Sequence, residues 1–222
     1  MTNAKHQISI DIVSDVVCPW CAIGYRQLVI AAGQMADRAE INVRWHPFEL
    51  VPGMPESGQN LADYSRERYG ASPEQSRGNR DRLVDAGKAL GLDFNYSPDS
   101  RIYNSHRAHQ LLTWAGETGG QTALKMELFH AYFTDQANIS DREVLIAAVE
   151  RAGLDTAAAR TVLEDGRYAD QVDAEVRHWQ DQNITGVPAF IVNNKMMIPG
   201  AQDASVFVQI IDKVIARESQ AA

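Results

Sequence analysis

The two cysteines of this chain, Cys18 and Cys21, stand two residues apart in the stretch SDVVCPWCAIG, with Pro19 and Trp20 between them. Two intervening residues bring the side chains within reach of a disulfide bond across one helical turn. The free amides and the dipole at a helix start would stabilise a thiolate on the first cysteine, and proline fits a first helical turn. The pair could therefore be a redox couple, half of a metal site, or two small buried hydrophobic residues.

As a redox couple, the two cysteines would divide the work. Cys18 would attack a partner disulfide to form a mixed disulfide, and Cys21 would then attack Cys18 and release the partner reduced. We expect a lowered pKa for Cys18 and a shielded Cys21. As for a metal site, the chain has no second Cys-x-x-Cys to complete four thiolate ligands, but His106 and His109, three residues apart on a predicted helix, keep a mixed site open.

The segments on both sides of the cysteines predict a strand, a helix and a second strand. Ile8, Ile10 and Ile12 alternate in HQISIDIVSD, which indicates a strand. The alanine-rich segment after the cysteines predicts a helix from about Cys18 to the late thirties. INVRWHPFEL predicts a second strand that Pro47 closes. Cys18 is thus expected in the first turn of a helix that follows a strand.

A loop, VPGMPESGQN, is predicted to lead into a helical zone. In that zone SHRAHQLLTWAGE and TALKMELFHAYFTD carry apolar residues at helical spacing. Ser140 and Glu143 stand at capping-box spacing before another helix, Gly153 is expected to stop that helix, and Asp155 is expected to cap the next. YADQVDAEVRHWQDQNITG predicts an amphipathic helix that ends near Gly186.

The last part of the chain returns to strands. PAFIV and KMMIP flank Asn193 and Asn194, a pair that tolerates positive φ and therefore favours a hairpin. Asp203 is expected to cap a final helix with a broad apolar face, which suits packing on a sheet. Without the helical zone, the order is a βαβ unit followed by an αββα unit.

Four motifs in this order resemble the DsbA family, and within it the FrnE-like branch: SDVVCPWCAIG, HPFELVPGMP, NSHRAHQLLTWA and GVPAFIVNNKMMIPGAQ. The resemblance implies an α/β thioredoxin-like fold with an inserted all-helical domain. The thioredoxin-like domain would comprise residues 1–47 and 168–222, and the helical insertion residues 48–167. It also implies a disulfide oxidoreductase with Cys18 as nucleophile, Cys21 as resolving thiol, and a cis peptide bond at Pro188 that faces the pair.

The remaining candidate residues are assigned with less support from the residues themselves. Pro19, Trp20 and Val187 are expected to bind substrate, because Trp20 would be exposed and Val187 would turn backbone groups toward the partner. The resemblance adds Phe48 and His109, and with them His46 and Asn104, on the side of the insertion. Two assignments stay open: Asp15 caps a loop or modulates proton transfer from Cys21, and Gly200–Gln202 line the site or only precede the last helix.

Composition limits the partners. The formal net charge of −8 would repel phosphate backbones and anionic lipid, so we expect no nucleic acid and no membrane partner. Two cysteines in 222 residues exclude a disulfide scaffold. Neither a signal-peptide apolar run nor a stretch of ~20 apolar residues is present, which predicts a cytoplasmic protein. We expect no cofactor and no metal; the oligomeric state stays open.

Three functions remain to be separated. The first is a thiol-disulfide oxidoreductase acting on protein or small-molecule disulfides, with glutathione as a candidate partner. The second is a glutathione-dependent isomerase or transferase that resembles 2-hydroxychromene-2-carboxylate isomerase and the kappa-class transferases, which activate glutathione from a serine or similar residue. The third is a zinc-binding protein without enzymatic activity. The presence of both cysteines favours the first, because a second thiol is useful chiefly for two-electron exchange.

Overall fold

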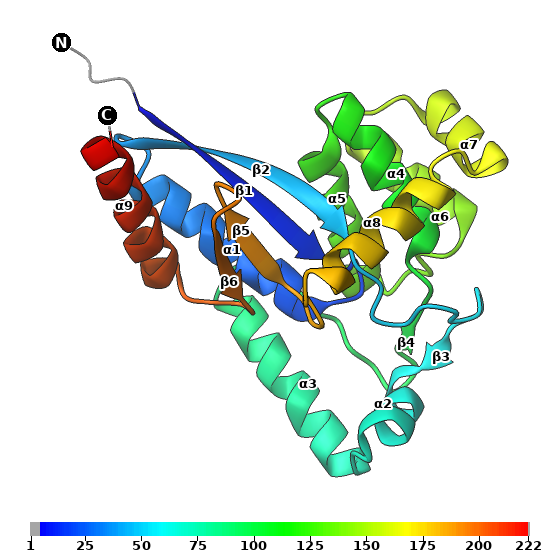
Figure 1. Cartoon of the computed structure of the whole chain (residues 1–222). Coiled ribbons are helices and arrows are strands. Elements are labelled where there is room, and N and C mark those ends of the chain that lie inside the picture. Colours follow the sequence, from blue (N-terminus) through cyan, green and yellow to red (C-terminus); the bar gives the residue numbers. More distant parts are fainter. Residues whose placement is uncertain (1–4, 222) are drawn as a thin grey trace.

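The structure, a computed structural model, describes residues 5–221, with side chains as far as Arg217. Its elements follow the predicted order, with a central sheet at one side of the molecule and most of the inserted helices at the other (Figure 1). The bounds are β1 His6–Ser14, α1 Pro19–Gln34, β2 Ala39–Pro47, β3 Gln59–Asn60, α2 Leu61–Tyr69, α3 Pro73–Lys88, β4 Arg101–Ile102, α4 His106–Glu117, α5 Gln121–Phe129, η1 His130–Thr134, α6 Arg142–Arg151, α7 Thr156–Asp165, α8 Ala169–Asp181, β5 Ala189–Val192, β6 Met196–Pro199 and α9 Ala204–Ala221.

The central sheet has the strand order β2-β1-β5-β6. The β1 and β2 strands are parallel and joined by α1, whereas β5 runs antiparallel to β1 and forms a hairpin with β6. Asn193 and Asn194 make the hairpin turn with φ values of 47° and 53°, as the sequence predicts. The sheet is therefore a βαβ unit and a ββα unit side by side, which is the predicted thioredoxin-like arrangement.

The two faces of the sheet differ in chemistry. Ile8, Ile10 and Ile12 are fully buried and pack in one core with residues of α1 and α9, two helices that contact each other. The opposite face carries Asp11 and His46, which hydrogen-bond to each other at 2.8 Å. Side chains of a strand alternate between the two faces of a sheet. The β1 strand therefore carries the isoleucines on one face and Asp11 on the other, where Asp11 meets His46 of β2.

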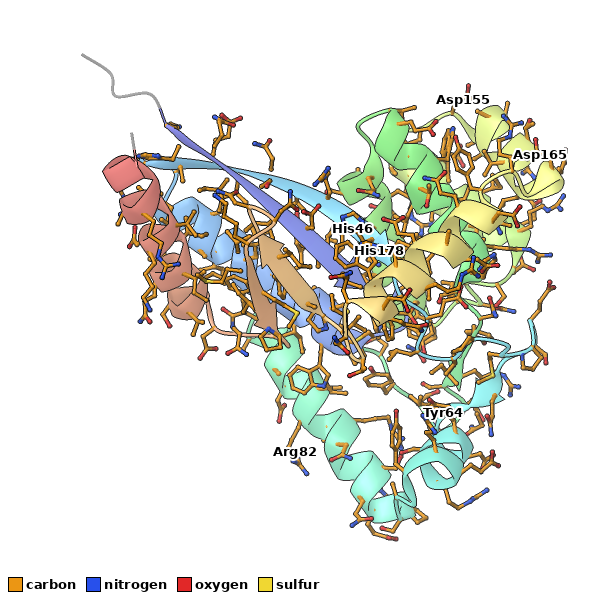
Figure 2. All side chains as sticks on the ribbon, in the orientation of Figure 1. His46, Tyr64, Arg82, Asp155, Asp165 and His178 are labelled. Carbon is orange, nitrogen blue, oxygen red and sulfur yellow. The ribbon has the colours of Figure 1, made fainter. Side chains whose placement is uncertain are left out.

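The α8 helix covers the polar face at the end of β2. His46 Nδ1 bonds Glu175 of this helix, and the His46 ring lies against Trp179 with the ring centroids 4.9 Å apart. Figure 2 shows His46 where β2 meets α8. A charged network therefore joins the sheet to a helix that follows the insertion.

The insertion is attached to the carboxyl end of β2 (Figure 1). At the start of α5, the Gln121 side chain accepts a bond from the Trp45 backbone N–H at 2.9 Å and donates to the Trp45 carbonyl at 2.9 Å. The Trp45 indole donates to Thr122 Oγ1 at 3.0 Å. Three hydrogen bonds thus fix the first turn of α5 on one residue of the sheet.

Several boundaries differ from the sequence predictions. The α1 helix ends at Gln34, before the late thirties, because Met35 turns the chain into β2 at Ala39. The α8 helix ends at Asp181, five residues before Gly186. The insertion is not entirely helical, since β3 and β4 form a two-stranded pair, and five residues from His130 form a π-helical turn. Strands of two residues give no periodic signal in a sequence.

The predicted capping box at Ser140 is wrong. Asp141 is the N-cap of α6, and its carboxylate accepts bonds from the N–H groups of Glu143 at 2.8 Å and Val144 at 3.2 Å. A carboxylate at this position also interacts favourably with the helix dipole. Ser140 instead donates to the Asn104 carbonyl at 2.9 Å, so it holds the insertion together.

The domain limits at residues 47/48 and 167/168 stay a prediction. One core cluster contains residues of both predicted parts, including Ile10 of β1 and Leu128 of α5. Within residues 5–221, no helix combines the length and the apolar character that a bilayer crossing requires.

Candidate active site

The cysteines lie where β1 gives way to α1. After Ser14 the chain makes a tight turn, in which the Cys18 N–H bonds the Asp15 carbonyl at 3.3 Å. Cys18 is the N-cap of α1, Pro19 takes the first helical position, and the Cys21 N–H bonds the Cys18 carbonyl at 3.1 Å. The predicted placement of Cys18 at a helix start is therefore confirmed.

Both thiols are free, and both are shielded from solvent. Cys18 is 3% exposed and Cys21 0%. Trp20, which stands between them, is 48% exposed and is one of the few exposed large apolar side chains among the described residues. A disulfide partner would therefore meet Trp20 and the edge of Cys18, while Cys21 lies beneath.

The peptide bond between Val187 and Pro188 is cis, as the resemblance implies. It faces the cysteines, because Cys18 Sγ lies 3.6 Å from the Val187 carbonyl oxygen in a thiol-to-carbonyl hydrogen bond. Gly24 of α1 lies close to Pro188 from the other side: a Cβ at this position would be 3.3 Å from Pro188 Cγ and 3.0 Å from Phe190 Cζ. The absence of a side chain at Gly24 thus lets the segment before β5, residues 184–188 (the proline loop), approach α1.

The electrostatics of the pair differ from the expectation for Cys18. The hydrogen bond to Cys21 and burial raise the pKa of Cys18 well above its ordinary value, and they outweigh the favourable backbone N–H of Cys21. Burial alone would also raise the pKa of Cys21, but the hydrogen bond from Cys18 and the charge of Lys125 lower it. The two thiols titrate as a coupled pair. The groups that stabilise a thiolate, the Cys18 hydrogen bond and Lys125, act on Cys21.

Three buried charged or titratable side chains surround the pair through direct or relayed electrostatic interactions: Asp15, His109 and Lys125, which are 0%, 2% and 1% exposed. Asp15 accepts the Leu50 N–H at 2.7 Å and the Val17 N–H at 3.4 Å, and His109 Nε2 lies 3.4 Å from the same carboxylate. Burial alone would raise the pKa of Asp15, but the hydrogen bond from His109 and that from Leu50 hold it below the ordinary value. Asp15 therefore caps two loops as an anion.

A cavity of about 390 Å³ lies beside the proline loop. Its lining runs from Asn183 through Ala189 and continues with Met197, Pro199 and Gly200. Gly200 N–H bonds the Pro188 carbonyl at 2.8 Å, which attaches the segment after β6 to this loop. Of the residues left open in Gly200–Gln202, Gly200 is the one that lines this cavity.

Comparison with known proteins identifies the family. Residues 9–212 match the family described as the DSBA-like thioredoxin domain. This chain belongs to the DsbA family. It is 32% identical to the probable DsbA oxidoreductase SCO1869 from Streptomyces coelicolor, with 94% of this chain and 90% of that chain covered and a TM-score of 0.88.

Two further comparisons found similar proteins. The chain is 28% identical over 206 residues to the uncharacterized protein YwbO of Bacillus subtilis (strain 168), a match that covers 92% of this chain and 96% of that protein. The cytosolic disulfide reductase DsbM from Pseudomonas aeruginosa, in a structure with GSH, is 16% identical, with coverage of 96% and 98% and a TM-score of 0.60. The latter likeness shows the fold alone. The FrnE-like branch within the DsbA family stays a prediction.

The predicted site residues of this DsbA family member fall into two groups. Pro19, Trp20, Val187 and Pro188 gather around Cys18. Phe48 and His109 lie inside the protein, where His109 Nε2 is 3.0 Å from the Phe48 carbonyl and Phe48 is 6% exposed. Their role as substrate contacts stays a prediction, and the contacts observed in the structure are internal.

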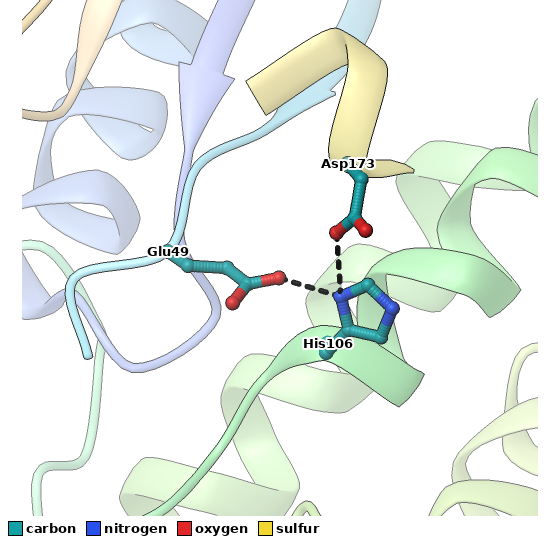
Figure 3. Close-up of side chains that lie close together, drawn as sticks. All are labelled: Glu49, His106 and Asp173. Atoms are coloured by element: carbon teal, nitrogen blue, oxygen red, sulfur yellow. Dashed lines mark hydrogen bonds and ion pairs between the residues drawn. The ribbon is translucent and has the colours of Figure 1, made fainter. Parts of the chain in front are cut away.

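The mixed metal site with the cysteines is not formed. His106 turns its Nδ1 to Glu49 at 2.7 Å and to Asp173 at 3.8 Å (Figure 3), whereas His109 turns to Asp15. Glu49, His106 and Asp173 each offer a ligand atom within 4.8 Å of the others, but no cysteine belongs to that group. The hydrogen bond to Glu49 outweighs burial and raises the pKa of His106, which favours an ion pair between His106 and Glu49.

Sequence reasoning missed Lys125. Its neighbours predict an ordinary amphipathic helix, on which a lysine is expected at the surface. The signal that could have drawn attention is its place one turn after Gln121 and close to Leu124 and Leu128 of the apolar stripe, but the sequence alone does not show which segment covers it.

Proposed function

We propose that the protein is a thiol-disulfide oxidoreductase in which Cys18 attacks the substrate and Cys21 resolves the mixed disulfide. The observation that carries the proposal is the position of Cys18, at a helix start and 3.6 Å from the carbonyl that precedes Pro188. In the reductive direction, the Cys18 thiolate forms a bond to one substrate sulfur and the other leaves as a thiolate that takes up a proton. Cys21 then forms the Cys18–Cys21 disulfide and displaces the second substrate thiol.

The substrate surface in this proposal is apolar and lies across Trp20 and the proline loop. Trp20 is 48% exposed and Met197, on the wall of the 390 Å³ cavity, 52%. Val187 offers its carbonyl at the reacting sulfur. Extended segments with apolar side chains next to the disulfide suit this surface, and so does a small disulfide such as oxidised glutathione. The GSH in the structure of the fold relative DsbM supports the latter.

The test uses Cys21→Ser to trap the intermediate. Reduced Cys21→Ser, incubated with glutathione disulfide or with disulfide-bonded insulin, should accumulate a mixed disulfide at Cys18 that mass spectrometry detects. The wild type should turn over and end with an internal disulfide, and Cys18→Ser should do neither. If Cys21→Ser accumulates no adduct while its thiol remains reactive toward iodoacetamide, the assignment of Cys18 as the attacking thiol is wrong.

The alternative function, the location and the class of substrate have separate tests. If Cys18→Ser keeps a glutathione-dependent isomerase or transferase activity, the alternative function replaces redox exchange. The cytoplasmic location predicted from the sequence is also part of the proposal, and fractionation of cells that express the natural chain tests it. Protein and small-molecule disulfides are distinguished by the species that Cys21→Ser captures.

A further inference from the structure

Lys125 is among the most deeply buried large side chains of the protein, although it carries an amine. It is 1% exposed, and its Nζ lies 5.2 Å from the ring centroid of Trp45 and 5.0 Å from that of Phe129. Among the described side chains, none forms an ion pair with it. A buried cation without a paired carboxylate is costly, so its position requires a physical explanation.

The position of Lys125 is fixed by the way α5 attaches to the sheet. Gln121 and Thr122 bind Trp45 through three hydrogen bonds, and Lys125 follows one helical turn later on the same side. The Trp45 ring also contacts Tyr25, with ring centroids 4.9 Å apart. Tyr25 stands four residues after Cys21 on α1, so the lysine and the resolving cysteine approach the same face of α1.

The charged groups around Lys125 come from several elements. Cys21 of α1, and Asp15 and Cys18 from the segment between β1 and α1, all stabilise its ammonium form by their charge. His46 at the end of β2 and His109 of α4 line a small cavity together with Lys125. The His46 ring nitrogens are engaged by Asp11 and Glu175, and His109 is engaged by Phe48 and Asp15. Both cysteine thiolates change charge in thiol-disulfide exchange, and of the two the charge of Cys21 has the larger effect on Lys125.

We propose that Lys125 is the charge partner of Cys21: its ammonium group stabilises the Cys21 thiolate while that thiolate attacks the mixed disulfide at Cys18. This inference rests on the proposed function and names the group that makes its second step possible. In this proposal Lys125 does not contact the substrate; it acts by stabilising the charge of Cys21. Lys125 comes from the inserted helices, whereas Cys18 is the N-cap of α1 and Cys21 lies in its first turn.

The protons and electrons of this step balance without a further reagent. The Cys21 thiol gives its proton to the neutral amine of Lys125, and the resulting thiolate attacks Cys18 Sγ. The Cys18–Cys21 bond forms, the bond from Cys18 to the substrate sulfur breaks, and the substrate sulfur leaves with the electron pair. The leaving thiolate takes the proton that Lys125 gives up. Burial lowers the pKa of Lys125 to about 8, so this amine can take up a proton and release it again near neutral pH.

The first experiment observes Lys125 in the unaltered protein. The ¹³Cε resonance of Lys125 is followed by NMR from pH 5 to 11, in the reduced and in the oxidised protein, and assigned with Lys125→Met. Oxidation removes the thiolate, so the acid dissociation constant of Lys125 should rise at least about tenfold. An identical titration in the two redox states would overturn the proposal, because a purely structural lysine would not respond to the Cys21 charge.

The second experiment uses Lys125→Met, which replaces a buried charge by an apolar side chain of similar length. The first step of thiolate formation, followed by absorbance at 240 nm, should move to higher pH. The dithiol form should be disfavoured about tenfold in equilibrium with glutathione, which corresponds to a potential about 30 mV more negative. Exposed Lys88, at the end of α3, gives the matched control Lys88→Met. This substitution should leave the thiolate titration and the reduction potential unchanged.

The two readouts separate this inference from the proposed function. If Lys125→Met reduces insulin at the wild-type rate and its thiols titrate as in the wild type, Lys125 is not the charge partner, although the oxidoreductase assignment stands. If neither protein reacts with any disulfide, the proposed function fails, while the NMR titration still reports whether Lys125 responds to Cys21. If Lys125→Met does not fold, the NMR comparison in the wild type decides.

Discussion

The two thiols should lose their protons in two well-separated steps, because one thiolate makes the second costly. Two unit charges about 4 Å apart, the reach of a sulfur hydrogen bond, repel by about 4 kcal/mol at an effective dielectric constant of about 20. At about 1.4 kcal/mol for each factor of ten, the second proton leaves roughly a thousandfold less readily than the first. The raised pKa of Cys18, whose largest cause is its hydrogen bond to Cys21, is the structural sign of this coupling.

Replacing Cys21 by serine tests the coupling directly. Serine keeps a hydroxyl donor but carries no charge in this pH range, so the anion must form on Cys18. There the backbone N–H of residue 21 and the helix start favour it, and the pKa of Cys18 should fall below its wild-type value. Absorbance at 240 nm from pH 4 to 11 should show one thiolate step in Cys21→Ser and two in the reduced wild type.

The matched control is Cys18→Ser, in which Cys21 titrates alone beside Lys125. Its single step reports how far the charge of Lys125 offsets burial without help from Cys18. The coupling argument is refuted if the reduced wild type loses both protons in one unresolved step. It is also refuted if Cys18 in Cys21→Ser titrates at the pH of the upper wild-type step, because removal of the neighbouring charge would then have no effect.

Three further predictions concern the proline loop, the sheet and the redox poise. Gly24→Ala would place a methyl group 3.0 Å from Phe190 and 3.3 Å from Pro188, so we expect a loss of about 1–3 kcal/mol in unfolding free energy and slower insulin reduction; wild-type values of both would contradict this. Burial opposes the charge of His46, but hydrogen bonds to two carboxylates raise its pKa. The protonated His46 therefore stabilises the fold fully below about pH 6.5, and this contribution is lost as the pH rises through the pKa of His46 in the folded state. Urea unfolding between pH 5 and 9 should show an unfolding free energy that depends less on pH in His46→Gln than in the wild type. Parallel pH dependences of the two proteins would exclude the effect. The reduction potential, measured by tryptophan fluorescence in glutathione buffers, should lie between about −270 mV, the value of thioredoxin, and about −120 mV, the value of DsbA. A potential outside these limits would contradict this prediction.

The parts of the site that the sequence predicts are those that depend on local patterns. Cys18 at a helix start follows from a strand pattern, a polar turn and a helix former within about twenty residues. The Asn193–Asn194 turn follows from two residues that tolerate positive φ between short apolar runs. The cis bond at Pro188 could not be derived from local pattern, because only ~5% of X-Pro bonds are cis, and it required the resemblance.

The contacts within the insertion depend on distant segments, and the sequence does not reveal them. Lys125 is buried because Gln121 binds the backbone of Trp45, which stands 76 residues earlier in the chain. His106 and His109 are three residues apart on α4 and could face one way, yet Glu49 attracts one ring and Asp15 the other. The partner residues Asp15, Trp45 and Glu49 lie at or just after the carboxyl ends of β1 and β2. The orientation of these helix side chains therefore depends on how the helices pack against the sheet.

These contacts link the inserted helices to the electrostatics of the cysteine pair. The sheet and α1 supply the two thiols and the proline loop, but they leave Cys21 fully buried, where burial disfavours its thiolate. The offsetting cation, Lys125, comes from α5, and His109, which keeps the buried Asp15 carboxylate ionised, comes from α4. Each of these groups is itself costly to bury, so the cost is lowest when all are present together. In the proposed mechanism, the attachment of α5 to Trp45 therefore positions the cation whose charge lowers the pKa of Cys21.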